Sequence, residues 1–92
     1  AWLSNEYDIK SNREEGKGRC DIILKAKKEG LASYVLEFKY LKEADTERLE
    51  ESAKEAVLQI KEKHYDAELQ GRTILIGLAH AGKEVWIEWQ ER

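Results

Sequence analysis

The sequence predicts a single α/β domain built on a mixed β-sheet, with its elements in the order βββαββ. Two observations lead to this fold class. Five segments carry the short apolar runs and two-residue alternation typical of strands, and one segment repeats apolar residues at threes and fours, which is typical of a helix. The chain has 92 residues, enough for one domain with one modest core.

Three strand-like segments come first. They read EYDIKSN, RCDIILKA and ASYVLEFKYL, at residues 6–12, 19–26 and 32–41. The second and third are rich in β-branched and aromatic residues. The intervening segments, REEGKG and KKEG, contain glycine and are short, so neighbouring strands should run antiparallel as a meander.

A helix is predicted next, from Asp45 or Thr46 to about residue 63. Either of these side chains can cap its first turn, and the acidic residues that follow suit the positive end of the helix dipole. HYDAEL, residues 64–69, is a candidate for one or two further turns, with Gly71 ending the helix. Its apolar face is formed by Leu49, Ala53, Ala56, Val57 and Ile60.

Two more strands complete the predicted sheet. They read RTILIGLAHA and EVWIEW, at residues 72–81 and 84–89, and a Gly-Lys turn joins them. A strand that returns after a helix usually lies parallel to the strand before that helix, so the sheet should be mixed.

The third predicted strand contains two charged residues inside an apolar run. The period of two places Glu37 and Lys39 on one face of the strand. If the second and third strands pair through the KKEG turn, Asp21 comes within a few residues of facing Glu37. A buried carboxylate is costly and two neighbouring carboxylates repel each other, so this arrangement calls for a compensating charge.

A divalent cation would supply that charge. The carboxylates of Asp21 and Glu37, with the main-chain carbonyl of Phe38, are hard oxygen ligands suited to Mg²⁺. Lys39 beside the metal can orient or activate an attacking water and offset charge on a phosphoryl group. The alternative is that Glu37 and Lys39 are two solvated charges or a weak cross-strand ion pair. The presence of Asp21 in the neighbouring strand favours the metal site.

Composition limits the possible partners. Charged residues make up 38% and apolar residues 41% of the chain, which indicates a globular protein. The net charge of −3 is unusual for a general nucleic-acid coat protein, although residues 10–28 carry a local charge of +4. No apolar run approaches the roughly 20 residues of a membrane helix. With Cys20 as the single cysteine, we expect no disulfide and a reducing compartment, the cytoplasm.

Four sequence blocks resemble a known family. They read SNREEGKGRCDIIL, YVLEFKY, EAVLQIKEKHY and IGLAHAGKEVWIEW, and together they cover nearly the whole chain from Ser11 on. In this order and spacing they resemble the PD-(D/E)xK phosphodiesterase superfamily, which has a restriction-endonuclease-like fold. The closer resemblance is to the nuclease-like domain at the C-terminus of bacterial AAA-ATPase-like proteins. We therefore expect residues 1–92 to be one such domain, cut from a longer protein that supplies a covalently linked ATPase-like domain.

The resemblance implies roles for four residues. Asp21 matches the first acid of the motif, Glu37 the second acid and Lys39 the lysine. Gln59 matches a helix glutamine that often lies near the active site of related nucleases. The function implied is a Mg²⁺-dependent (or Mn²⁺-dependent) nuclease that hydrolyses DNA with a metal-activated water. The alternative is a non-catalytic module that keeps the fold and serves the larger protein as a binding platform.

Some features of the chain depart from the family pattern. Cys20 stands where the motif has its proline, which is not a ligand. The usual first helix is largely missing, with only AWLSN as a possible remnant, so one sheet face should lack cover and we expect a homodimer. Tyr65 follows Gln59 by six residues and not by the four of some relatives, so it receives no role. Arg13, Lys17 and Arg19 are candidate phosphate contacts, although their segment more simply forms a turn or bulge.

Overall fold

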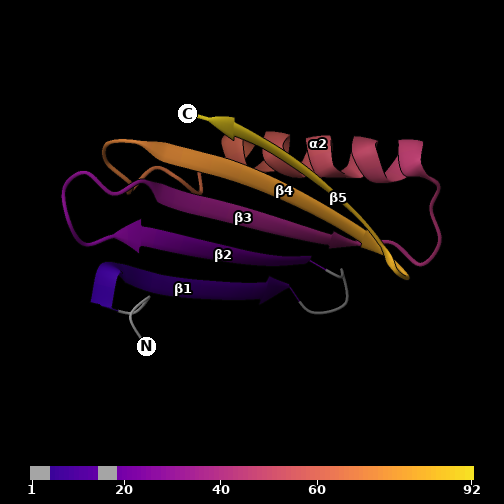
Figure 1. The fold of residues 1–92 in the computed structure, drawn as a ribbon, viewed down its shortest axis with the longest axis horizontal. Helices are drawn as coiled ribbons and strands as arrows, with labels where there is room; N and C mark the ends of the chain where they lie inside the picture. Colours follow the sequence, from indigo (N-terminus) through magenta and orange to yellow (C-terminus); the bar gives the residue numbers. More distant parts are fainter. Residues whose placement is uncertain (1–4, 15–18) are drawn as a thin grey trace.

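The computed structural model describes residues 5–14 and 19–92, and the side chains within 5–11 and 21–92. Five strands and one long helix follow one another in the predicted order βββαββ (Figure 1). Their bounds are Tyr7–Glu14 for β1, Arg19–Ala26 for β2, Ser33–Tyr40 for β3, Thr46–Glu62 for α2, Thr73–Ala81 for β4 and Glu84–Glu91 for β5. Within the described residues, no helix is both long and apolar enough to cross a membrane.

The strands form one five-stranded sheet in sequence order, β1-β2-β3-β4-β5. β1, β2 and β3 pair antiparallel, as expected from their short connections. β3 and β4 pair in parallel, and β5 returns antiparallel to β4. The predicted mixed sheet is confirmed. The parallel pair follows from α2, which carries the chain back along the sheet before β4 begins (Figure 1).

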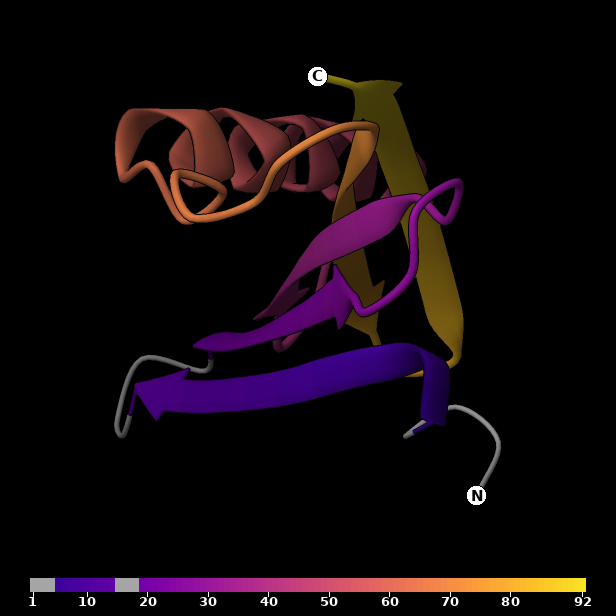
Figure 2. The ribbon, with the colours of Figure 1, turned by 90° about the vertical axis from the view of Figure 1, so that its left-hand side faces the viewer.

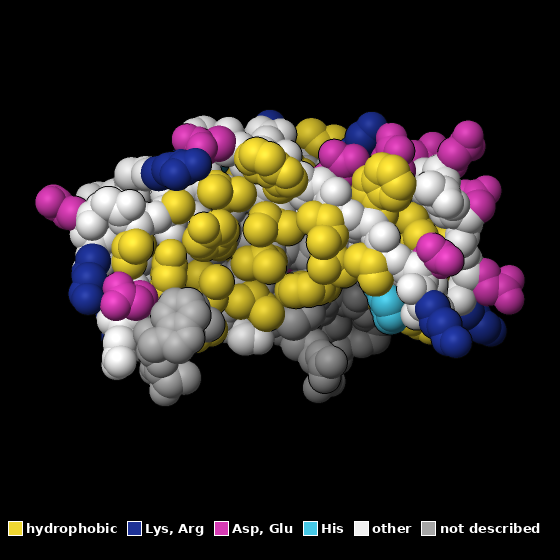
Figure 3. Space-filling view, viewed as in Figure 1, with side chains coloured by type: hydrophobic (Ala, Val, Ile, Leu, Met, Phe, Trp, Pro, Cys, Tyr) yellow, Lys and Arg dark blue, Asp and Glu magenta, His cyan; other side chains and the backbone are white. Residues whose placement is uncertain are grey.

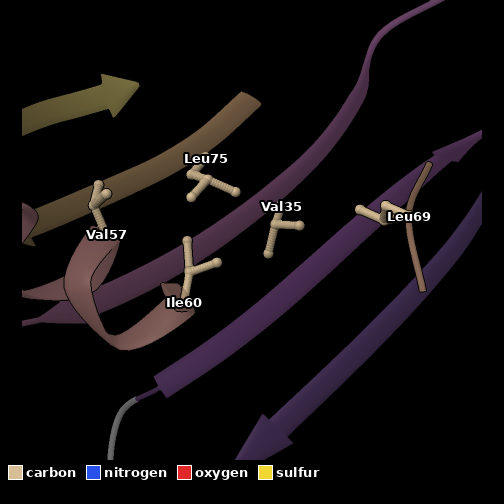
Figure 4. Close-up of a cluster of buried hydrophobic side chains, with 5 residues drawn as sticks. All are labelled: Val35, Val57, Ile60, Leu69 and Leu75. Atoms are coloured by element: carbon tan, nitrogen blue, oxygen red, sulfur yellow. The ribbon is translucent and has the colours of Figure 1, made fainter. Parts of the chain in front are cut away.

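One face of the sheet is covered by α2. The helix packs mainly on β3, β4 and β5, while β1 lies at the sheet edge away from it (Figure 2). The predicted apolar stripe of the helix is buried, and so are the strand residues that it contacts. One core cluster consists of Val35, Val57, Ile60, Leu69 and Leu75 (Figure 4), and a second consists of Leu49, Ala53, Ala79 and Ala81.

The predicted start of α2 is confirmed, whereas its predicted end is wrong. Asp45 caps the first turn as expected, because its Oδ1 accepts a hydrogen bond of 2.8 Å from the backbone N–H of Arg48. The expected extension through HYDAEL is wrong. His64 has a left-handed backbone with φ of 54°, so the helix stops at Glu62 and Gly71 does not end it.

The opposite face of the sheet has no helix over it among the described residues. Several large apolar side chains on this face are at least half exposed, and Figure 3 shows hydrophobic side chains gathered across the strands. They include Ile9, Tyr40, Val85, Ile87 and Trp89. We call these five residues the open apolar face. The expectation that AWLSN is the remnant of a first helix concerns residues 1–4 mainly, which lie outside the described residues.

Candidate active site

Asp21 and Glu37 lie directly opposite each other in β2 and β3. Since opposite residues of an antiparallel pair share a face, both carboxylates point toward the side of the sheet that α2 covers. Asp21 is 7% exposed and Glu37 is fully buried at 0%. Among the described residues, Oδ1 of Asp21 and Oε2 of Glu37 are buried atoms without a hydrogen-bond partner. From the sequence, we expected Asp21 within a few residues of facing Glu37. In the structure the two residues are direct partners across β2 and β3.

The backbone opposite Glu37 explains how a carboxylate comes to be buried there. Gly77 is the partner of Glu37 in the parallel neighbour β4. A side chain at Gly77 would run into the backbone oxygen of Ala53 and lie 2.9 Å from Cβ of Ala56. Glycine therefore lets α2 approach the sheet closely at this point, which shuts solvent away from Glu37.

Lys39 lies on the same face of β3 but pairs with the helix and not with Glu37. Its Nζ lies 3.4 Å from Oε2 of Glu55, and the side chains are 15% and 51% exposed. Oε1 of Glu55 lies in turn 3.7 Å from Nη1 of Arg48. Glu55 thus holds the ammonium of Lys39 at the mouth of the site. Sequence analysis missed Glu55, although its position four residues before Gln59 puts both on one helix face.

Gln59 lies half-buried in α2, one turn beyond Glu55. The helix runs opposite to β3 (Figure 1), so the step from Glu55 to Gln59 follows the same direction as the step from Lys39 to Glu37. Four helix residues rise about 6 Å and two strand residues about 6.6 Å. Because Glu55 contacts Lys39, this match puts Gln59 level with Glu37. Its catalytic role remains a prediction.

Tyr65 lies near the same part of α2. Sequence analysis assigned it no role, because it follows Gln59 by six residues. The backbone N–H of Tyr65 donates to the carbonyl of Ile60, and that of His64 donates to Lys61. This is the hydrogen-bond pattern of a Schellman motif, which folds the residue after the left-handed position back onto the helix end. Tyr65 consequently packs against the core cluster of Figure 4. Burial raises the pKa of Tyr65, and the negative charges of Asp21 and Glu37 add to this increase, so its hydroxyl keeps its proton.

The donor set fits a hard divalent cation. Two facing carboxylates supply oxygen atoms, and a buried Oδ1 of Asp21 is still in need of a partner among the described residues. Phe38 lies between Glu37 and Lys39 in β3, and its main-chain carbonyl remains a predicted third ligand. No group of three or more His, Cys, Asp or Glu side chains suited to a metal occurs in the described part of the chain. Two carboxylates do not fill the coordination shell of Mg²⁺, so a cation held here would need further ligands from the main chain or water.

The remaining candidates are only partly described. Lys17 lies outside the described residues, and for Arg13 and Arg19 only the backbone is described. Arg13 is the Cα partner of Cys20 across β1 and β2, and Arg19 is the Cα partner of Lys39 across β2 and β3. The backbone of Arg19 thus runs beside that of Lys39. Phosphate contact by these three residues stays a prediction.

Comparisons with known proteins agree with the geometry. The sequence profile of the PD-(D/E)XK nuclease superfamily matches residues 1–90, which is nearly the entire chain. Curated protein sequences and solved structures give no significant match. The superfamily is one whose members generally use divalent metals. The mixed five-stranded sheet with a helix between β3 and β4 is consistent with a restriction-endonuclease-like fold. Because the family match spans nearly all of its residues, the chain belongs to the PD-(D/E)XK nuclease superfamily.

Proposed function

We propose that this domain is a Mg²⁺-dependent nuclease that hydrolyses phosphodiester bonds in DNA. The observation that carries the proposal is the register of β2 and β3, which sets Asp21 against Glu37 on the buried side of the sheet with Lys39 next to them. Paired buried carboxylates are hard to justify as stabilising elements, because each loses hydration and repels the other. They are well suited to holding a cation.

The roles of the residues follow from their positions. Asp21 and Glu37, with the carbonyl of Phe38, would hold the cation, which when bound supplies Lewis-acid stabilisation of phosphate charge and makes water more acidic. Lys39 orients the attacking water and offsets negative charge that builds up on the phosphoryl group. Glu55 keeps the Lys39 ammonium at that position. Gln59 borders the same space from α2.

A metal titration tests this proposal. The parent domain should bind Mg²⁺ and Mn²⁺ saturably and cleave plasmid or single-stranded DNA in their presence. Asp21→Asn should weaken metal binding more than tenfold, because one anionic ligand becomes a neutral amide. Glu84→Gln is the control, since Glu84 is exposed at the start of β5, away from the carboxylate pair. A well-folded parent that neither binds metal nor cuts DNA would exclude the catalytic function.

The open apolar face supports a second candidate, a binding platform within a larger protein. The resemblance to C-terminal domains of bacterial AAA-ATPase-like proteins makes a covalently linked ATPase-like domain in the cytoplasm our proposed context.

Exposed apolar patches of several hundred Å² commonly become interfaces. Five strands about 4.8 Å apart, each with about eight residues of 3.3 Å, give a face on the order of 600 Å². Two copies would bury about 1,200 Å², the lower limit for a stable interface.

We therefore expect a two-fold homodimer through the open apolar face. Light scattering on a concentrated sample should report twice the monomer mass. Ile87→Glu should give the monomer, because it places a charge within the apolar interface. Leu58→Glu is the matched control, since Leu58 is 53% exposed on α2 and Ile87 is 55% exposed on β5. A parent domain that stays monomeric at high concentration would contradict the dimer.

A further inference from the structure

A groove of about 360 Å³ lies beside the carboxylate pair. Residues of β1 and β2 line one of its sides, and residues of the segment that follows α2 line the other. This part of the sheet is open because α2 packs mainly on β3, β4 and β5. Its lining includes Lys10, Ile23, Lys25, Tyr65, Glu68 and Leu69.

The side of the groove that β2 forms follows on from Asp21 along that strand. Ile23 and Lys25 follow Asp21 on the same face of β2, at steps of about 7 Å. On the other side, Tyr65 lines the groove and packs against the same core cluster as Ile23. A polymer with its reacting phosphate at the carboxylates would therefore extend into this groove.

The charges along the groove favour an anionic ligand. Its two acidic residues are already paired: Glu68 lies 3.8 Å from Lys10, and Asp8 lies 3.8 Å from Lys27. The Lys10–Glu68 pair is 71% and 82% exposed, so water and salt weaken it and a phosphate can replace the carboxylate at little cost. Lys25 is exposed and forms no ion pair within the described part of the chain. The groove thus offers Lys25, and Lys10 by exchange, to a phosphate.

The apolar lining favours an unpaired base. Ile23 and Tyr65 are partly buried side chains packed against the core cluster, so they form a firm surface. Aromatic rings bind single-stranded nucleic acids by stacking on bases, and every base offers a face for this contact. A base inside a duplex has both faces covered by its neighbours. The groove volume also lies at the lower end of the range for ligand sites, which suits a single strand.

We propose that this groove binds a single-stranded segment next to the scissile phosphate, with a phosphate at Lys25 and a base against Tyr65. The inference deepens the proposed nuclease function and rests on it for the position of the reacting phosphate. It assigns the domain a substrate with unpaired nucleotides on one side of the cleavage point, such as a single strand, an overhang or a flap.

The test is binding of a short fluorescein-labelled single-stranded DNA to the Asp21→Asn protein, followed by fluorescence anisotropy. Lys25→Gln should weaken binding roughly fivefold and lower the salt slope by about 0.7, the value for one phosphate contact on a single strand. Tyr65→Leu should weaken binding about tenfold through lost stacking, whereas Tyr65→Phe should bind within about twofold of the unsubstituted residue. A blunt duplex of the same length should bind more weakly than the single strand.

The controls separate this inference from the nuclease function. Lys83→Gln removes the same charge from the exposed β4–β5 turn and should leave affinity unchanged. Melting curves identify any variant that fails to fold, and Lys25→Gln, at an exposed position, should remain folded. Folded Lys25→Gln and Tyr65→Leu proteins that bind like the parent, or tighter binding of the duplex, would overturn the groove assignment even if the parent cuts DNA. Loss of binding in both variants supports the groove even if the parent cuts nothing, a result that would remove only the catalytic proposal.

Discussion

Replacing Lys39 by methionine should lower DNA cleavage by about 10², the effect expected when one positioned electrostatic group is lost from an active site. Stability should change by no more than about 1 kcal/mol, because the lost ion pair joins Nζ to a Glu55 side chain that is half exposed. Methionine is a better replacement than alanine, since only 15% of the lysine side chain is exposed and its stem fills space. Single-turnover cleavage and thermal melting measure the two effects.

Two comparisons make this result specific. Lys42→Met removes an exposed lysine just after β3 and should cut DNA at the parent rate. Glu55→Gln keeps Lys39 but removes the charge that holds it, so we expect a smaller loss of about tenfold. Glu51→Gln is matched to it, because Glu51 also pairs with Arg48, at 3.5 Å, on the same helix. Equal cleavage rates for the parent and Lys39→Met would remove the role assigned to this lysine while leaving the nuclease function intact.

Gly77→Ala should destabilise the domain by about 3 kcal/mol, at the upper end of the usual cost of overpacking a core. The added Cβ would clash with the backbone oxygen of Ala53 and lie 2.9 Å from Cβ of Ala56 and 3.1 Å from Cγ2 of Val57. A backbone clash cannot be relieved by a side-chain rotation, so α2 would have to move away from β4. For a domain of this size the melting temperature should fall by roughly 15 °C.

Gly30→Ala provides the contrast. Gly30 has a φ of +89°, and among the described residues a methyl group there would meet no atom within 4 Å beyond its chain neighbours, so its replacement costs only backbone strain, about 1 kcal/mol. Gly77→Ala should also reduce metal binding, because Gly77 is the strand partner of Glu37. A Gly77→Ala protein with the melting temperature of the parent would show that the backbone of α2 does not contact β4 closely at Gly77.

The sequence by itself determined the order of the elements and brought the acids and the lysine of the candidate site near one another. The period of two in β2 and β3 and the helical period in α2 are local properties, so the order βββαββ followed from them. Because side chains alternate between the two faces of a strand, Glu37 and Lys39 were also expected on one face of β3. The short turn between β2 and β3 left only a few possible registers, which is why Asp21 was expected close to Glu37 before the pairing was known.

Only the tertiary structure decided which groups surround that pair. Lys39 and Glu55 are 16 residues apart, and their contact depends on how α2 lies across β3. Tyr65 reaches the site because His64 takes a left-handed conformation, and neither its residue type nor its spacing from Gln59 indicated this. Such contacts arise from packing between elements distant in sequence, which no local period encodes.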